Sequence, residues 1–357
     1  MTVTAAEDAV APAGAPRRAP PDPRAALRAA GVADAAGIAA ARLRDLSRSH
    51  ALTYAELEDG SAYVVKRRSP EAHASGRSLA AELYVYRLAS WLPGLAGIVA
   101  EAVWLDERRE VLVLVAAPSE HLLPAWAPAP GFPGAAMCAE LGRALAALHA
   151  ATRDVPVPAT AACGIIALPD TAPEDRGVAR DGGAAPVADA AAGDPALTEA
   201  LRRCGALLEP SCLVHGDVKW DNAILDPGPP AAVRLLDWEL SGLGDPAWDV
   251  GAGLADTLSF GVRLRGPAAA PADAGAWVDA AARALLMAYA AGRNDLAGTF
   301  AEAVAGCWVA RTLHLAIECA AAAGDPDHPA VTDLLALART GAASYDALAG
   351  AIAEAMS

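Results

Sequence analysis

The chain has 357 residues, a length that suggests two domains or two large lobes and a core that needs no disulfide support. Its composition, 54% hydrophobic and 20% charged, is that of a globular protein, and the net charge of -15 argues against a broad nucleic-acid or anionic-membrane surface. The six cysteines form no C-x-x-C pair, which indicates free thiols in a reducing compartment. No stretch has about 18 strongly apolar residues in a row, and the opening MTVTAAED is unlike a secretory signal, so we expect a cytoplasmic protein without a membrane-spanning helix.

The first part of the chain indicates a small sheet with one helix. Residues 1–23 are rich in Ala, Pro and charge without periodicity, which predicts a disordered tail. In residues 24–117, runs of apolar and aromatic residues predict two hairpins, the first with an Asp-Gly turn. The predicted strands are 52–57, 62–66, 102–105 and 111–115, and the predicted helix, which a Pro-Gly pair ends, is 78–91.

The rest of the chain, residues 118–357, is predicted to be mainly helical. A Leu stripe predicts a helix over 136–151, and several Ala- and Leu-rich helices are expected from about residue 276. Gly, Pro and Asp punctuate residues 169–195 without an apolar stripe, so this segment is predicted to be a flexible insertion. The expected fold class is therefore α+β, with a small antiparallel sheet and one helix followed by a larger, mainly helical lobe.

A polar island within residues 212–237 is the strongest candidate for chemistry. Apolar ends anchor the segment LVHGDVKWDNAIL, and an apolar strand then leads to a second acidic residue. Asp217, Asn222 and Asp237 thus offer two carboxylates and one amide oxygen. Such hard oxygen ligands suit Mg²⁺, which binds through one or two carboxylates together with substrate phosphates.

Four segments carry a resemblance to a known family. They are HGDVKWDN at 215–222, LLDWE at 235–239, GDPAWD at 244–249 and ELGRALAALH at 140–149. With them the chain resembles the aminoglycoside phosphotransferase and choline kinase family over roughly residues 40–340. The resemblance implies a bilobal, protein-kinase-like fold and phosphotransfer to an alcohol group.

The resemblance also implies a role for each polar residue of the island. Asp217 is expected to accept the proton of the attacking hydroxyl, and Lys219 to meet the transferred phosphoryl group, as in many Ser/Thr protein kinases. Asn222 and Asp237 are expected to hold Mg²⁺ between the nucleotide phosphates. Glu239 is either a further metal contact or a solvated acid, and a turn-cap role is the structural alternative for Asp217 and Asp237.

Further residues are expected to support the island or to meet the acceptor. Asp249 is expected to hold the catalytic loop from behind, with a helix cap as the alternative, and His149 and His215 are expected to have structural roles. One face of a predicted C-terminal helix forms either a wall of the acceptor pocket or an internal polar seam, and it carries Trp308, Arg311, His314 and Glu318.

The N-terminal lobe offers the ion pair that a kinase needs at the nucleotide. Lys66 ends a predicted strand, and Glu82 lies on the apolar face of the following helix, where a carboxylate is costly without a partner. We therefore expect the two to pair, with Lys66 on the α and β phosphates. The alternatives are a solvated Lys66 with Arg67 or Arg68 in its place, and a surface position for Glu82.

The turn expected to cover the nucleotide, near residues 46–50, contains no glycine and so departs from the protein-kinase pattern. Members of the resembling family often use Ser or other polar groups there, which makes Ser47 and Ser49 the candidate phosphate-binding residues. The segment 115–120 is the expected hinge, whose backbone would meet the adenine.

The predicted function is ATP- and Mg²⁺-dependent transfer of the γ-phosphate to a hydroxyl of a small molecule, with GTP as the alternative nucleotide. An aminoglycoside or amino alcohol suits the acidic charge. Lys219 and the flanking segments, which are similar to those of phosphotransferases encoded with peptide natural-product pathways, favour an alternative: Ser or Thr of a precursor peptide, with pathway enzymes as partners. The third alternative is a catalytically silent pseudokinase, and no nucleic-acid or membrane partner is expected.

Overall fold

The computed structural model describes residues 22–47, 50–68, 79–126, 134–157, 164–176, 182–226, 231–265 and 274–357. The chain divides into two compact units. The first comprises Met1–Ser78 with Trp104–Val113, and the second comprises Leu79–Val103 with Leu114–Ser357. By its contacts the helix predicted over 78–91 groups with the second unit, and the lobe boundary expected between residues 117 and 118 stays a prediction.

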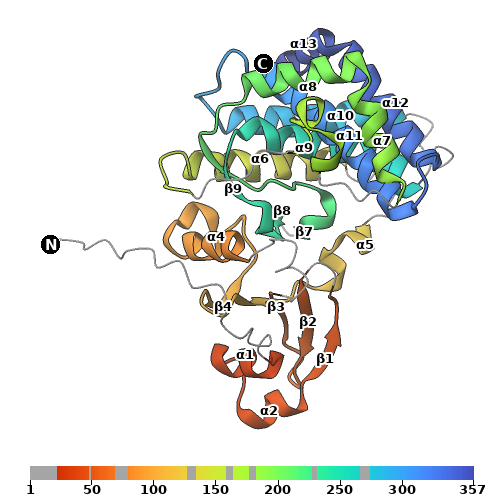
Figure 1. Ribbon diagram of the computed structural model, residues 1–357. Coiled ribbons are helices and arrows are strands. Elements are labelled where there is room, and N and C mark those ends of the chain that lie inside the picture. The colour runs from red at the N-terminus through yellow and green to blue at the C-terminus, as the bar shows by residue number, and fades with distance from the viewer. Residues whose placement is uncertain are drawn as a thin grey trace, which may run out of the picture. The chain divides into compact units, whose positions relative to one another are not determined.

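The first unit carries most of a five-stranded sheet with the order β1-β2-β3-β5-β4 (Figure 1). Its strands are β1 (Arg42–Asp45), β2 (Ala51–Glu56), β3 (Ala62–Arg67), β4 (Ala102–Asp106) and β5 (Val111–Val115). The first three strands are antiparallel neighbours, and the register pairs Leu52 with Lys66. The Asp-Gly turn forms as predicted: Gly60 has a φ of 85°, and Asp59 Oδ1 accepts the Ser61 N–H at 2.9 Å.

Two short helices pack on this sheet, and the sequence analysis did not predict them. They are α1 (Pro23–Ala30), which Asp22 caps, and α2 (Ala35–Ala40), which Asp34 caps. Each gives one large side chain to the core of the first unit, which contains Leu27, Ile38, Val65, Val111 and Val113. The predicted tail 1–23 therefore ends earlier than expected, and residues 1–21 lie outside the described part.

The second unit is mainly helical, as predicted. Its helices are α4 (Ala80–Trp91), α5 (Leu123–Trp126), α6 (Ala135–Ala151), α7 (Ala184–Ala192), α8 (Pro195–Leu207), α9 (Pro246–Arg265), α10 (Ala274–Ala291), α11 (Phe300–Ala323), α12 (Pro329–Ala343) and α13 (Tyr345–Met356). Helix α11 lies among the others and packs against α7, α8, α9, α12 and α13 (Figure 1). By length and composition α11 alone among the described helices matches a membrane span, but 83% of the matching window is buried in protein, as in the core helix of a globular domain.

The helix α7 corrects the prediction of an irregular insertion over 169–195. Its sequence AAPVADAAA buries a stripe of small residues, which an analysis of large apolar side chains does not find. The chain before α7 is also closely packed, because a Cβ on Gly183 would lie 2.5 Å from the carbonyl oxygen of Ala320. Residues 177–181 of the predicted insertion are outside the described part.

Two small ladders in the second unit frame the polar island. Strand β6 (Cys212–Val214) pairs with β9 (Gly242–Gly244), and β7 (Ala223–Asp226) pairs with β8 (Ala232–Leu235). The loop 215–222 runs from β6 to β7, and the short 3-10 helix η6 (Trp238–Leu240) follows β8. The ladders thus hold the HGDVKWDN and LLDWE segments at their ends.

Candidate active site

The loop 215–222 begins with a backbone conformation that requires glycine. Gly216 has a φ of 84°, and a Cβ at this position would lie 2.3 Å from the carbonyl oxygen of Leu240. His215, which is fully buried, donates from Nε2 to the Leu236 carbonyl oxygen at 2.8 Å and accepts the Asp217 N–H on Nδ1 at 3.2 Å. These two bonds place the ring proton on Nε2 and give His215 the structural role that the sequence predicted.

Asp249, at the start of α9, holds the same loop from behind. Its carboxylate accepts the His215 N–H at 2.6 Å and the Gly216 N–H at 2.9 Å. His149 Nε2 lies 3.1 Å from the same carboxylate, and its Nδ1 lies 3.0 Å from the hydroxyl of Tyr289. Asp249 and His149 are both fully buried, so each is part of a closed hydrogen-bonded network.

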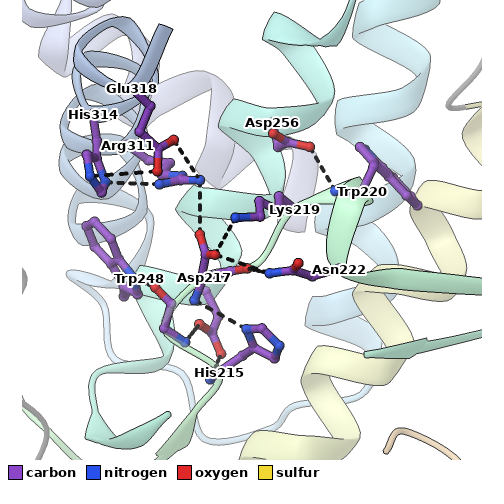
Figure 2. Close-up of polar contacts among 12 residues, drawn as sticks. His215, Asp217, Lys219, Trp220, Asn222, Trp248, Asp256, Arg311, His314 and Glu318 are labelled. Carbon is purple, nitrogen blue, oxygen red and sulfur yellow. Dashed lines mark hydrogen bonds and ion pairs between the residues drawn. The ribbon is translucent and has the colours of Figure 1, made fainter. Parts of the chain in front are cut away.

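The carboxylate of Asp217 is held on both oxygens (Figure 2). Lys219 Nζ donates to Oδ2 at 2.5 Å, and Asn222 Nδ2 donates to the same oxygen at 3.1 Å. Arg311 Nη2, from α11, forms an ion pair with Oδ1 at 3.1 Å. Burial works to raise the pKa of Asp217, but the positive charges of Arg311 and Lys219 outweigh it and lower the pKa to about 2. Asp217 is therefore an oriented, ionised carboxylate.

The helix face predicted to carry Trp308, Arg311, His314 and Glu318 lies on α11. At Arg311 this face is buried and forms an internal polar seam. Arg311 is 2% exposed, donates from Nη1 to His314 Nδ1 at 2.9 Å and lies 3.5 Å from a Glu318 carboxylate oxygen. Burial and the nearby Arg311 lower the pKa of His314. Trp308 is separate from this cluster, since its ring packs where a Cβ on Gly341 of α12 would lie. The contact between Arg311 and Asp217 was not predicted, because no local pattern links residues 94 positions apart.

Asn222 and Asp237 are brought side by side by the β7–β8 ladder. The Leu236 N–H donates to the Asn222 carbonyl oxygen at 2.8 Å, one residue before Asp237. Asn222 Nδ2 donates to both the backbone carbonyl and the carboxylate of Asp217, so its Oδ1 is the atom suited to a cation. Asp237 adopts a left-handed conformation with a φ of 62°, which is uncommon for a residue with a side chain.

The donor chemistry at this position fits Mg²⁺. In the described part of the chain, no three His, Cys, Asp or Glu side chains gather as a ligand set. An amide and a carboxylate nevertheless match an ion that keeps several waters and binds substrate phosphates. Glu239 is half-buried in η6, two residues after Asp237.

The predicted nucleotide residues lie in different units. Lys66 on β3 is 5% exposed and Glu82 on α4 is 1% exposed, and their pairing stays a prediction. Arg67 donates to Thr53 Oγ1 at 3.0 Å and Arg68 pairs with Glu110 at 2.5 Å, so both alternatives have partners within the first unit.

The predicted phosphate-covering turn is only partly described. Ser47 Oγ donates to Asp45 Oδ1 at 2.5 Å and accepts the Leu52 N–H at 3.0 Å, so its hydroxyl closes the β1–β2 turn. Ser49 lies outside the described residues.

On α4, burial raises the pKa of Tyr86 well above its ordinary value, and the nearby charges of Glu82 and Asp237 add to the effect.

Comparison with known proteins assigns the family. Residues 42–293 match the phosphotransferase enzyme family, and the chain belongs to it. It is a phosphotransferase with an alcohol group as acceptor, and it has the protein-kinase-like α+β fold that the sequence predicted. No curated protein matches the chain.

Solved structures with the same fold are distant in sequence. The amicoumacin kinase hAmiN, in complex with AMP-PNP, Ca²⁺ and Ami, is 16% identical, with a TM-score of 0.59 over 91% of this chain and 94% of that one. The choline kinase LicA from Streptococcus pneumoniae is 14% identical, with a TM-score of 0.54 over 85% and 93%. The ethanolamine kinase from Plasmodium vivax is 11% identical, with a TM-score of 0.53 over 88% and 85%.

Proposed function

We propose that the protein transfers the γ-phosphate of ATP to a hydroxyl group of a small molecule, with Mg²⁺ as the metal. The observation that carries this is the ionised carboxylate of Asp217, which Lys219 and Asn222 hold through one oxygen. In this proposal residues 24–117 form the nucleotide-binding lobe, residues 118–357 form the lobe with the catalytic loop and acceptor site, and the protein works in the cytoplasm.

The geometry at Asp217 suggests how the acceptor is activated. Oδ2 already accepts from Lys219 and Asn222, whereas Oδ1 has the Arg311 ion pair and lone-pair capacity for a further donor. The acceptor O–H donates to Oδ1, its oxygen attacks the γ-phosphorus, the bond to ADP breaks, and the proton moves to Asp217. A pKa of about 2 makes Asp217 a weak base. This is sufficient for a loose transition state, in which proton transfer is late and positioning dominates.

The nucleotide and its metal are assigned to residues with matching chemistry. Asn222 Oδ1 and the carboxylate of Asp237 would hold Mg²⁺, with Glu239 as a further contact, and the ion would neutralise charge on the β and γ phosphates. Lys66 would contact the α and β phosphates with Glu82 as its partner, and Ser47 and Ser49 would lie over them. The AMP-PNP in the amicoumacin kinase complex supports ATP over the alternative GTP.

The acceptor is assigned by charge and by analogy. The net charge of -15 favours a cationic acceptor, and choline and ethanolamine kinases share the fold. A second candidate is Ser or Thr of a precursor peptide, with pathway enzymes as partners. It is supported by Lys219, which stands two residues after Asp217, as in many Ser/Thr protein kinases, and bonds to Asp217 at 2.5 Å. A silent pseudokinase is disfavoured, because Lys66, Glu82, Asp217, Asn222 and Asp237 are all in the chain.

The experiment that tests this function incubates the protein with Mg²⁺, γ-labelled ATP and pools of aminoglycosides, amino alcohols, macrolides or Ser/Thr peptides. The transfer of label to each pool is then measured. Asp217→Asn is expected to lower transfer by about 10²- to 10⁴-fold, the usual contribution of a general base. ATP with Mg²⁺ should still raise the melting temperature of this variant, since binding to the folded state stabilises it. Asp221→Asn, a change at an exposed carboxylate of the same loop, is the control and should keep wild-type transfer. Near-normal transfer by Asp217→Asn would contradict the assignment.

A further inference from the structure

The guanidinium of Arg311 is a buried charge on the helix α11, opposite the catalytic loop. Its side chain is 2% exposed, whereas those of His314 and Glu318 are 36% and 43% exposed. The latter two lie further along the same face of α11 (Figure 2). Taking an arginine out of water is costly unless its charge and its N–H groups are satisfied. The contacts of this buried charge therefore have to account for its place on α11.

The contacts of Arg311 fix both its position and its orientation. Nη2 lies 3.1 Å from Asp217 Oδ1 and 3.5 Å from Glu318 Oε2, while Nη1 donates to His314 Nδ1 at 2.9 Å. Burial and the charge of Arg311 lower the pKa of His314, which favours the neutral ring that can accept this bond. The hydrogen bond to His314 orients the guanidinium, and its charge then lies against Oδ1 of Asp217.

Arg311 supplies a restraint on Asp217 that the loop does not. Lys219 and Asn222, which both hold Oδ2, belong to the same loop as Asp217, so their bonds move with that loop. The ion pair to Oδ1 comes from α11 and ties the carboxylate to an element outside the loop. Oδ1 is also the oxygen that the acceptor hydroxyl would meet.

We infer that Arg311 is a positioning residue, which holds the Asp217 carboxylate in place for the acceptor hydroxyl and is itself held by His314 and Glu318. The inference rests on the proposed function, in which Asp217 receives the acceptor proton. Arg311 acts through Asp217 and not on the nucleotide. Its loss should therefore slow the transfer step and leave nucleotide binding intact.

The test uses the full-length protein with the acceptor found by label transfer, or with water as acceptor in an ATP hydrolysis assay. Arg311→Met should lower kcat by about 100-fold, the cost that a misplacement of about 1 Å can have, while the KM for ATP stays as in the wild type. Arg311→Lys, which keeps the charge, should recover part of that loss. In Arg311→Ala, guanidinium at millimolar concentration should restore part of kcat.

Two further variants separate positioning from folding. Glu318→Gln removes one support of Arg311 at a half-exposed site, so the protein should stay folded and kcat should fall less than in Arg311→Met. Arg203→Met removes ion pairs to Glu302 of α11 and to Asp346 instead, and it should lower stability without changing kcat. Circular dichroism and melting temperature verify that each variant is folded.

The possible results separate this inference from the function on which it rests. A folded Arg311→Met variant with wild-type kcat would overturn the positioning role alone. The same conclusion would follow if kcat and the affinity for ATP fell together without recovery by lysine or guanidinium. Wild-type protein that bound ATP but transferred phosphate to no acceptor, water included, would overturn the proposed function and the positioning role with it.

Discussion

The backbone N–H of His215 donates to the carboxylate of Asp249 at 2.6 Å, so a residue of α9 fixes the start of a loop that lies 34 positions earlier in the chain. The Gly216 N–H donates to the other carboxylate oxygen at 2.9 Å. The His215 N–H is buried and the Gly216 N–H is partly buried, and a buried donor without an acceptor is costly. The position of Asp217, the next residue, therefore depends on Asp249.

We predict that Asp249→Ala lowers the free energy of unfolding by about 2–5 kcal/mol, because one buried and one partly buried donor lose their acceptor. Phosphate transfer should fall as well, since the loop that carries Asp217 loses its support. Chemical denaturation and the label-transfer assay measure the two effects. Asp245→Ala is the matched control: Asp245 accepts N–H groups of Glu209 and Ala247, so its loss should affect stability more than transfer. An Asp249→Ala variant as stable as the wild type would contradict the prediction.

Gly216 gives a second test of the loop geometry. Its φ of 84° costs a residue with a side chain about 1–2 kcal/mol, and a Cβ would also meet the Leu240 carbonyl oxygen at 2.3 Å. Gly324 ends α11 with a φ of 65°, but nothing lies within 4 Å of its Cβ position. Gly216→Ala should therefore lower the denaturation midpoint and the transfer rate clearly more than Gly324→Ala. Equal losses in the two variants would show that the close approach to Leu240 is unimportant.

The sequence predicted the elements whose signals are local. The strands β2 to β5 and the helices α4 and α6 lie within two residues of their predicted bounds, because turn residues and apolar periodicity mark them. Several of the elements missed are short or built from small residues, whereas the longer α8 and α9 were expected only as part of a mainly helical lobe. Thus β1 has four residues with an exposed pattern, α2 has six residues, and α7 packs through alanines.

The candidate site, too, was predictable from the sequence only where its residues lie close together in the chain. The spacing of Asp217, Asn222 and Asp237 predicted a joint site, and the β7–β8 ladder brings Asn222 beside Asp237. The partner of Asp217 on α11 was not predictable. Arg311 was singled out only as part of a helix face, and its place beside Asp217 depends on how distant helices pack. Contacts of this kind come from tertiary structure, which local patterns do not encode.

Lys66 is predicted to be the lysine that binds the nucleotide. Lys66→Met should raise the KM for ATP by about tenfold or more, as expected for the loss of a hydrogen bond to a charged group, about 1.5–3 kcal/mol. Arg67→Met, one residue later on β3, removes a bond to Thr53 and should leave the KM near the wild-type value. Steady-state kinetics over a range of ATP concentrations makes the comparison. A larger effect at Arg67 would favour the other strand register for the nucleotide.

The metal site gives a prediction that does not depend on the acceptor. ATP with Mg²⁺ should raise the melting temperature of the wild type more than ATP with EDTA, because the complex of protein, nucleotide and metal forms only when Mg²⁺ is present. In Asn222→Ala and Asp237→Ala this difference should be small or absent. Asp221→Ala, which removes an exposed neighbouring carboxylate, should keep it. A full Mg²⁺-dependent shift in Asp237→Ala would exclude Asp237 as a principal ligand.

The pH dependence of stability is predicted at Asp194, the N-cap of α8. Burial works to raise its pKa, but the Leu197 and Ala196 N–H groups and Arg339 outweigh this and hold the pKa below its ordinary value. A carboxyl with a lowered folded-state pKa stabilises the protein above its unfolded-state pKa, and the contribution is lost as the pH falls through the folded value. Asp194→Ala should therefore cost about 1 kcal/mol at neutral pH, a typical N-cap loss, and Asp194→Asn, which can still cap, should cost less. In urea denaturation, the difference in free energy of unfolding between the wild type and Asp194→Ala should become smaller below about pH 4. A difference that stays constant down to about pH 2 would contradict a charged cap.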